Sequence, residues 1–166
     1  TLARYRTQAV ADYLARRLAA ERSGGVRFKI LRALGTLAHA PASRSERLRF
    51  DREHFEAEAH KNLVEHFRLR GIAAALERES DGRNAGDTDV GKALLSLLRD
   101  KIHQSLERAF RALQIAHRNE DLLSVHQAIE RGDKRARGNA LELLDALPVT
   151  SRETRELLKL VADDLD

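Results

Sequence analysis

The stretch "RARGNALELLDALP", residues 135–148, indicates the fold class of this chain. Its leucines recur at helical spacing and Pro148 ends the run, so the stretch predicts one helix. Gly138 and Asn139 stand inside that helix, although the pair costs roughly 1.5 kcal/mol relative to two alanines. A helix that keeps such residues is expected to use them in packing against neighbouring helices.

Two packing roles follow from the positions of these residues. Gly138 and Ala140 are both small, so one side of the helix is expected to let a neighbour approach closely. Asn139 lies four residues before Leu143 and is therefore expected to face inward with the leucines. Because a buried amide needs hydrogen-bond partners, we expect Asn139 to bond to the backbone of adjacent turns and to fix the stacking angle of helix pairs.

The composition of the 166-residue chain favours helices packed on helices. Hydrophobic residues make up 42% of the chain and aromatic residues 4%, and two prolines interrupt it. We expect one all-α domain over residues 1–166, as part of a longer chain. The absence of cysteine excludes disulfides and thiolate metal sites. No apolar run approaches the roughly 18 residues of a membrane span.

Hydrophobic periodicity predicts about seven helices, which form antiparallel pairs because the links between them are short. Capping residues stand where helices are expected to begin: Asp51, Asp133, and either Thr150 or Ser151. The segment 80–89, "SDGRNAGDTD", is expected to be the main loop. The expected helical segments are 2–20, 26–40, 51–80, 90–100, 103–117, 120–132, 134–147 and 151–166.

Three of these segments resemble one another. Residues 26–37, 105–116 and 135–147 each place a basic residue early, a small residue in the middle and leucines near the end. Arg27 and Arg137 both follow a turn closely. Helix pairs that repeat every 30–45 residues are typical of an α-solenoid.

The turn followed by "VR" resembles the turn of HEAT repeats. Residues 97–117 and 128–148 are similar to one particular group of HEAT-repeat regions. They resemble the HEAT-repeat region that follows the membrane domain of bacterial nucleotide-carrier-like and major-facilitator-like transporters. The resemblance covers residues 92–148 well and residues 1–40 loosely, and the element Asn139–Asp145 is its strongest part. The residues of the repeat motif are Arg27, Asp133, Arg137, Gly138, Asn139 and Asp145.

That resemblance implies a right-handed HEAT-like solenoid that serves as a non-catalytic scaffold. Its partner would be another protein or a neighbouring domain of the same chain. The segment would belong to the cytoplasmic part of a membrane transporter-like protein, with the membrane-spanning part outside these residues.

Patterns for catalysis and metal binding are weak in the sequence. It contains no Gly-x-Ser-x-Gly elbow, no P-loop and no dinucleotide fingerprint, so we expect no catalytic residue and no cofactor. In residues 52–67, His54 and Glu58 share one helix face, and Glu56 and His60 share another. Because these pairs point in different directions, we expect a solvated helix face there and no metal site.

The net charge of +4 leaves nucleic-acid binding as an alternative function. The 30 basic and 26 acidic residues are interleaved, which is typical of a solvated helix surface. A basic concave surface would use Arg16, Arg17, Lys29 and Arg32 to contact phosphates. The lack of Trp counts against a pocket that handles bases.

The ends of the chain are expected to expose apolar side chains, because a solenoid cut from a longer array lacks its neighbours. We therefore expect weak self-association, or packing against neighbouring domains, through the terminal helices. The residues concerned are Leu2, Tyr5 and Tyr13 at one end and Leu157, Val161 and Leu165 at the other.

Overall fold

The computed structural model describes residues 6–40, 47–82, 89–132 and 134–163, and every regular element in these ranges is an α-helix. The predicted all-α class is therefore confirmed. The seven helices of the described ranges are α1 (Gln8–Ala20), α2 (Gly24–His39), α3 (Arg52–Gly82), α4 (Asp89–Ala116), α5 (Leu122–Arg131), α6 (Lys134–Ala146) and α7 (Arg152–Asp163).

Helix starts follow the capping residues in the sequence. The Asp51 carboxylate accepts a hydrogen bond from the His54 N–H at 3.3 Å, and Ser151 Oγ accepts one from the Thr154 N–H at the same distance. The cap predicted at Asp51 is confirmed, and of the alternatives Thr150 and Ser151 it is Ser151 that caps α7. Asp133 lies outside the described residues. The Asp121 carboxylate caps α5 in the same way, through the Ser124 N–H.

One predicted boundary is wrong. Residues 90–100 and 103–117 were expected to form two helices, but α4 runs without a break from Asp89 to Ala116. The residues between them include no glycine and no proline, and Leu98, Ile102 and Leu106 continue the same helical stripe. Nothing in this stretch therefore stops helix propagation. Of the loop expected at 80–89, residues 80–82 belong to α3, and residues 83–88 lie outside the described ranges.

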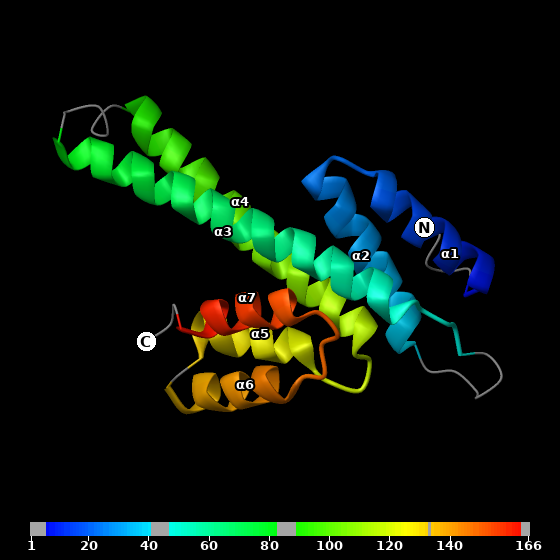
Figure 1. Cartoon of the computed structure of the whole chain (residues 1–166). Coiled ribbons are helices and arrows are strands. Elements are labelled where there is room, and N and C mark those ends of the chain that lie inside the picture. The colour runs from blue at the N-terminus through cyan, green and yellow to red at the C-terminus, as the bar shows by residue number, and fades with distance from the viewer. Residues whose placement is uncertain (1–5, 41–46, 83–88, 133, 164–166) are drawn as a thin grey trace.

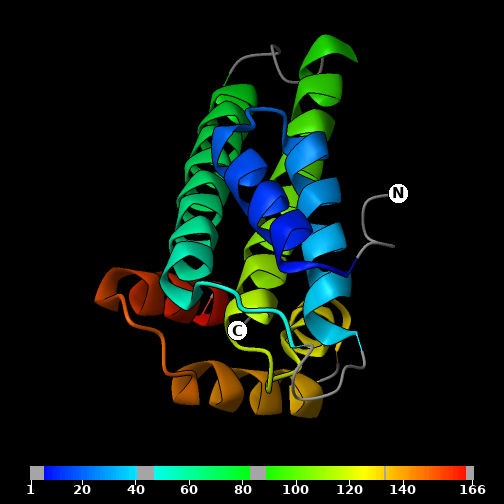
Figure 2. The same ribbon diagram turned by 90° about the vertical axis from the view of Figure 1, so that its right-hand side faces the viewer.

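A long hairpin of α3 and α4 organises the molecule (Figure 1). Helix α2 packs on α4, and α1 packs on α2. Helix α5 packs on α4 from the other side, α6 contacts α5 and α7, and α7 returns to contact α3. The outer half of the hairpin, residues 68–82 and 89–102, projects beyond the other helices, whereas its inner half is covered on both sides (Figures 1 and 2).

The hydrophobic core follows this arrangement. One cluster of buried residues takes in all seven helices and includes the fully buried rings of Phe55 and Phe110 in the inner half of the hairpin. A second, small cluster joins Leu69 and Ala73 of α3 to Leu98 of α4 in the outer half. In the described ranges, this cluster and the exposed Arg99–Glu77 ion pair join α3 to α4 in the outer half.

The expectations for Gly138 and Asn139 are wrong. Asn139 is exposed, because α6 turns Ala140 and Leu144 toward the core and Asn139 lies about 100° away from Ala140 around the helix. A Cβ atom added at Gly138 would have no neighbour within 4 Å, so no helix approaches closely there. Neither residue takes part in stacking.

The expected apolar chain ends are corrected in part. Val161 is buried, because α7 packs against α3 instead of ending an array, and Leu157 is partly buried. Tyr13 is 52% exposed, as expected. Leu2, Tyr5 and Leu165 lie outside the described ranges.

In the described ranges, no helix combines the length and the apolar character that crossing a bilayer requires.

We predict opposite effects for alanine at two glycines. A Cβ at Gly132 would lie 2.3 Å from the Ala128 carbonyl oxygen, so Gly132→Ala is expected to destabilise the protein by about 1–3 kcal/mol. Gly138→Ala, which meets open space in mid-helix, is expected to stabilise it by about 0.5–1 kcal/mol. Urea denaturation measures both free energies of unfolding. Destabilisation by Gly138→Ala would show that α6 has a close neighbour at this position.

Candidate functional site

A buried polar network, which we call the clamp, joins α2 to the inner half of the hairpin. Glu58, Asn62 and Glu65 lie along one face of α3 at i, i+4 and i+7. Arg27 of α2 forms an ion pair with Glu58. Arg108 of α4 donates through Nε to Asn62 Oδ1 at 2.8 Å and through Nη2 to Glu65 Oε2 at 3.1 Å. Two cations and two carboxylates thus meet at the contact of three helices.

Three members of the clamp are shielded from water, whereas the side chains of Arg27 and Glu65 are 17% and 37% exposed. Glu58 is 1% exposed, Asn62 0% and Arg108 4%. Burial, and next the charge of Arg108, lowers the pKa of the Arg27 guanidinium, whereas the carboxylate of Glu65 opposes that shift. The clamp therefore acts as a structural contact between α2 and the hairpin.

The first residue of α2 fits against the clamp because it has no side chain. A Cβ atom at Gly24 would lie 3.1 Å from Arg108 Nη1, a tighter contact than most Cβ atoms make. Glycine therefore lets the start of α2 approach the Arg108 guanidinium.

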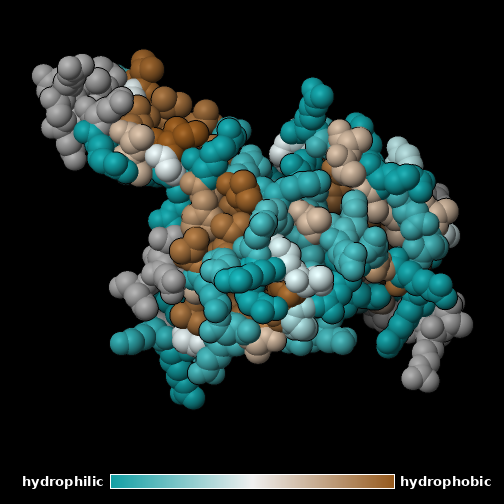
Figure 3. Space-filling view, in the orientation of Figure 1, coloured by the Kyte–Doolittle hydropathy of each residue, from teal (hydrophilic) through white to brown (hydrophobic). Residues whose placement is uncertain are grey.

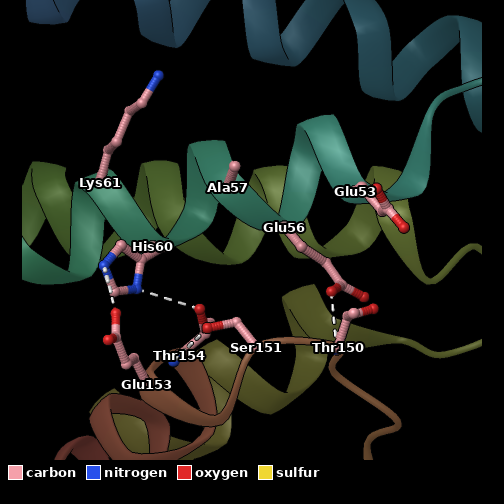
Figure 4. A pocket seen from close by; sticks show the side chains of 9 residues that line it. All are labelled: Glu53, Glu56, Ala57, His60, Lys61, Thr150, Ser151, Glu153 and Thr154. Carbon is pink, nitrogen blue, oxygen red and sulfur yellow. Dashed lines mark hydrogen bonds and ion pairs between the residues drawn. The ribbon is translucent and has the colours of Figure 1, made fainter.

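A second polar cluster lines a cavity of about 410 Å³ between α3 and the start of α7 (Figure 4). The buried Glu56 carboxylate accepts a hydrogen bond from the Thr150 N–H at 2.8 Å and one from Arg52 Nε at 2.7 Å. Burial alone would raise the pKa of Glu56, but these two donors outweigh it and hold the pKa below its ordinary value. His117 Nε2 lies 3.0 Å from the same carboxylate.

In this cavity a hydroxyl, an imidazole and a carboxylate stand in the order of a catalytic triad. His60 Nδ1 and Thr154 Oγ1 are 3.1 Å apart, and His60 Nε2 lies 3.9 Å from Glu153 Oε2. Thr154 has no exposed surface, and the Glu153 carboxylate is beyond hydrogen-bond distance of the imidazole. The contact therefore serves to hold α7 on α3.

A third cluster joins α4 to α5. His103 Nδ1 and His126 Nε2 lie 2.7 Å and 3.2 Å from the same oxygen of Glu130. His126 is buried, whereas His103 is exposed. In the part of the chain that the structure describes, no three His, Cys, Asp or Glu side chains are arranged to hold a metal ion.

The helix face expected to be solvated in residues 52–67 is instead largely buried. Glu56, Glu58 and His66 are each less than 10% exposed, because α3 packs along α4 and contacts α7, and Arg27 of α2 pairs with Glu58. Glu58 pairs with Arg27 and Glu56 bonds to Thr150, so both carboxylates are engaged with other elements and do not face solvent.

The residues of the repeat motif are spread over the molecule. Arg27 belongs to the clamp, Arg137 is partly buried on α6, and Asp145 is exposed at the end of the same helix. Gly138 and Asn139 lie on the outer side of α6, and Asp133 is outside the described residues.

The four basic residues expected to form one surface are exposed on α1 and α2. Arg17 forms an ion pair with Glu21 at 2.9 Å. Arg16 lines a hollow between α1 and the start of α3, and Arg32 lines a different hollow between α2 and α4. The structure thus places Arg16 and Arg32 in separate hollows, and Lys29 on α2.

Sequence reasoning missed Asn62, Glu65 and Arg108. The signal that could have found them is the polar stripe Glu58–Asn62–Glu65 on a helix whose other stripe is apolar. A polar stripe of this kind needs cationic or amide partners if a second helix covers it.

Comparisons of the chain with protein-family models, with curated proteins and with solved structures find no match.

Removing Arg108 should destabilise the protein strongly. Arg108→Ala leaves Asn62 and Glu65 without their buried donor, so we expect a loss of about 3 kcal/mol. The matched control is Arg99→Ala, which breaks another Arg–Glu pair between α3 and α4, Arg99–Glu77. Because that pair is exposed, its loss should cost less than about 1 kcal/mol. Equal losses in thermal or urea unfolding would contradict the structural role of the clamp.

Stability should fall with acidification below about pH 6.5. Burial, as the largest cause, lowers the pKa values of His66, His117 and His126 from their ordinary 6.5. Between the lowered pKa and 6.5, the unfolded chain binds more protons than the folded chain, so the stabilisation present above 6.5 is lost as pH falls. Urea midpoints at about pH 7.5 and about pH 5.5 measure this loss.

The control for the pH experiment is His66→Gln. His66 Nδ1 donates to the Ile102 carbonyl at 3.0 Å, a bond that the Gln amide can replace without titrating. The variant should lose less stability between the two pH values than the parent. A pH dependence identical to the parent's would show that His66 does not contribute.

Proposed function

We propose that this chain is a non-catalytic helical scaffold that binds another protein or a neighbouring domain of its own polypeptide. The observation that carries the proposal is the projecting outer half of the hairpin, which exposes large apolar side chains. Ile72, Val90, Leu94 and Leu97 are between 44% and 78% exposed. Exposed apolar side chains gathered on one part of a surface mark sites of protein contact.

The buried charges support the same proposal. The clamp joins α2, α3 and α4, the Glu56 and His60 contacts join α3 to the chain around α7, and Glu130 joins α4 to α5. These contacts fix the positions of the helices that meet the hairpin, which gives its projecting half a rigid base.

As the fold and the protein context of this scaffold, we propose a HEAT-like α-solenoid in the cytoplasmic part of a bacterial membrane transporter-like protein. It is supported by the resemblance over residues 92–148 and by the succession of helix pairs α1/α2, α3/α4 and α5/α6, in which each pair contacts the next. The contact of α7 with α3 goes beyond such nearest-neighbour stacking. The open reading frame that contains this segment tests the assignment: apolar segments of about 20 residues ahead of it are expected.

A photo-crosslinking experiment in cells tests the scaffold function. A photoreactive residue is placed at Leu97, at Lys29 on the basic α2 surface, or at Leu160 of α7 as a control. Leu97 and Leu160 are 51% and 49% exposed, so their accessibility is matched. We expect a specific protein adduct from Leu97 and none from Leu160, with the captured polypeptide identified by mass spectrometry.

The same experiment separates the two functional candidates. A nucleic-acid adduct from Lys29, with none of protein from Leu97, would favour a nucleic-acid-binding domain that uses the basic residues of α1 and α2. Equal protein adducts from Leu97 and Leu160 would also contradict a dedicated contact surface on the hairpin.

A further inference from the structure

A hollow between α1 and the start of α3, which we call the α1 hollow, combines an apolar lining with charged side chains. Its volume is about 310 Å³. Ala11 and Phe55, each 1% exposed, belong to its apolar lining. A concave site with an apolar lining and a few convergent polar groups is typical of small-molecule binding. The charged and polar side chains around the hollow are Asp12, Arg16, Arg49, Asp51 and His54.

Arg49 reaches the α1 hollow from a connector that is held in place. Residues 47–50 form no helix, yet the Gln8 side chain bonds to both backbone groups of Arg49. It accepts from the Arg49 N–H at 2.8 Å and donates to the Arg49 carbonyl at 2.9 Å. Arg118 Nη1 donates to the Leu48 carbonyl at 3.0 Å. The backbone that carries Arg49 is therefore fixed, as the support of a binding residue needs to be.

The carboxylates of the α1 hollow have donors, whereas its guanidinium groups have no acceptors. Asp12 Oδ1 accepts a hydrogen bond from Gln8 Nε2 at 2.7 Å, and the Asp51 carboxylate caps the start of α3. The side chains of Arg16 and Arg49 form no hydrogen bond or ion pair within the part of the chain that the structure describes. Two cations without acceptors beside an apolar lining favour an anionic ligand.

A buried nitrogen in the same lining also lacks a partner. His54 Nε2 is buried and has no hydrogen-bond partner among the described residues. The imidazole packs edge-on against Phe55, with the ring centres 5.2 Å apart, so the ring is held in position. Because buried polar atoms are nearly always hydrogen-bonded, this nitrogen calls for an acceptor. An oxygen of a ligand in the α1 hollow would supply it.

The charges and the volume restrict the class of ligand. Asp12 and Asp51 also line the hollow and repel a dianion such as a phosphate monoester, whereas one carboxylate suits two guanidinium groups and an imidazole N–H. The apolar lining favours apolar carbons against it. A volume of about 310 Å³ lies near the lower end of ligand pockets, so the carbon body is one ring or a short alkyl chain.

We propose that the α1 hollow binds a small organic carboxylate. Its oxygens bond to Arg16, Arg49 and His54 Nε2, and its carbon body lies against Ala11 and Phe55. The three donors come from α1, from the connector 47–50 and from α3, so the bound carboxylate joins the three elements. Because the site exists only in the folded chain, binding also raises the free energy of unfolding.

The α1 hollow is separate from the surface on which the scaffold function depends. Figure 3 shows hydrophobic residues gathered over the projecting half of the hairpin, residues 68–82 and 89–102, whereas the hollow lies at the opposite end of α3, beside α1 (Figure 1). Carboxylate binding and protein contact therefore succeed or fail independently.

Titration with benzoate and with hexanoate, followed by the backbone amide signals in NMR, tests the proposal. We expect saturable binding with a dissociation constant of about 1 mM or lower for at least one of the two. The signals of Ala11, Arg49 and His54 should shift. Benzyl alcohol and benzylamine, which lack the carboxylate, should bind at least about tenfold more weakly than benzoate.

Three results of this titration would overturn the proposal. They are no saturable binding of either carboxylate, binding of benzylamine as tight as that of benzoate, and tighter binding of phenyl phosphate than of benzoate.

Substitutions test which cations bind the carboxylate. Arg16→Gln and Arg49→Gln should each raise the benzoate dissociation constant at least about tenfold. The melting temperature without benzoate should not change, because neither guanidinium has a partner among the described residues. The matched control is Arg17→Gln, since Arg17 also lies on α1 but pairs with Glu21 at 2.9 Å and is outside the hollow. Equal weakening by all three variants would show a general effect of charge and overturn the site.

His54→Leu separates a ligand donor from a structural residue. Removing an unpartnered buried nitrogen leaves no other group unsatisfied, so the variant should keep its free energy of unfolding in urea and bind benzoate several-fold more weakly. A variant that loses stability but binds benzoate as the parent does would contradict the role of His54 in the site.

Discussion

The ion pair between Arg27 and Glu58, extended by Arg108, is the contact on which the placement of the N-terminal helices depends. Helix α1 packs on α2, so whatever fixes α2 on the hairpin fixes α1 as well. An apolar seam alone would let α2 shift along the hairpin with little change in buried area. The buried charges of the clamp prevent such a shift, because moving α2 along the hairpin would separate the ion pair and leave a buried charge without its partner.

The local features of the fold could be predicted from the sequence. Asp51 and Ser151 are capping residues that act through atoms a few positions away, so the chain itself carries the full signal. The wrong boundary in α4 has a local cause too. Residues 101 and 102 were treated as a link, although neither is a residue that interrupts a helix.

The contacts between helices and the residues of the clamp could not be predicted from local sequence signals. Arg27 and Glu58 are 31 residues apart and Arg108 and Asn62 are 46 apart, and periodicity identifies a face without naming what covers it. The same limit explains the two opposite errors. Glu56 and Glu58 were expected in solvent and are buried, since α3 is covered from two sides, whereas Asn139 was expected in the interior and lies on an outer helix. Hydrophobic spacing predicts the buried face of a helix correctly only where the helix is covered on one side.

The return of α7 to α3 has a consequence for how the chain folds and unfolds. His60 and Thr154 are 94 residues apart in sequence, so their contact closes a loop that contains α4, α5 and α6. An array of nearest-neighbour contacts can grow from any unit, but here we expect α7 to dock after the hairpin has formed, as a slow last step of folding. Tension applied at the C-terminal end would detach α7 first and free α5 and α6 next, while the clamp between α2 and the hairpin stays intact.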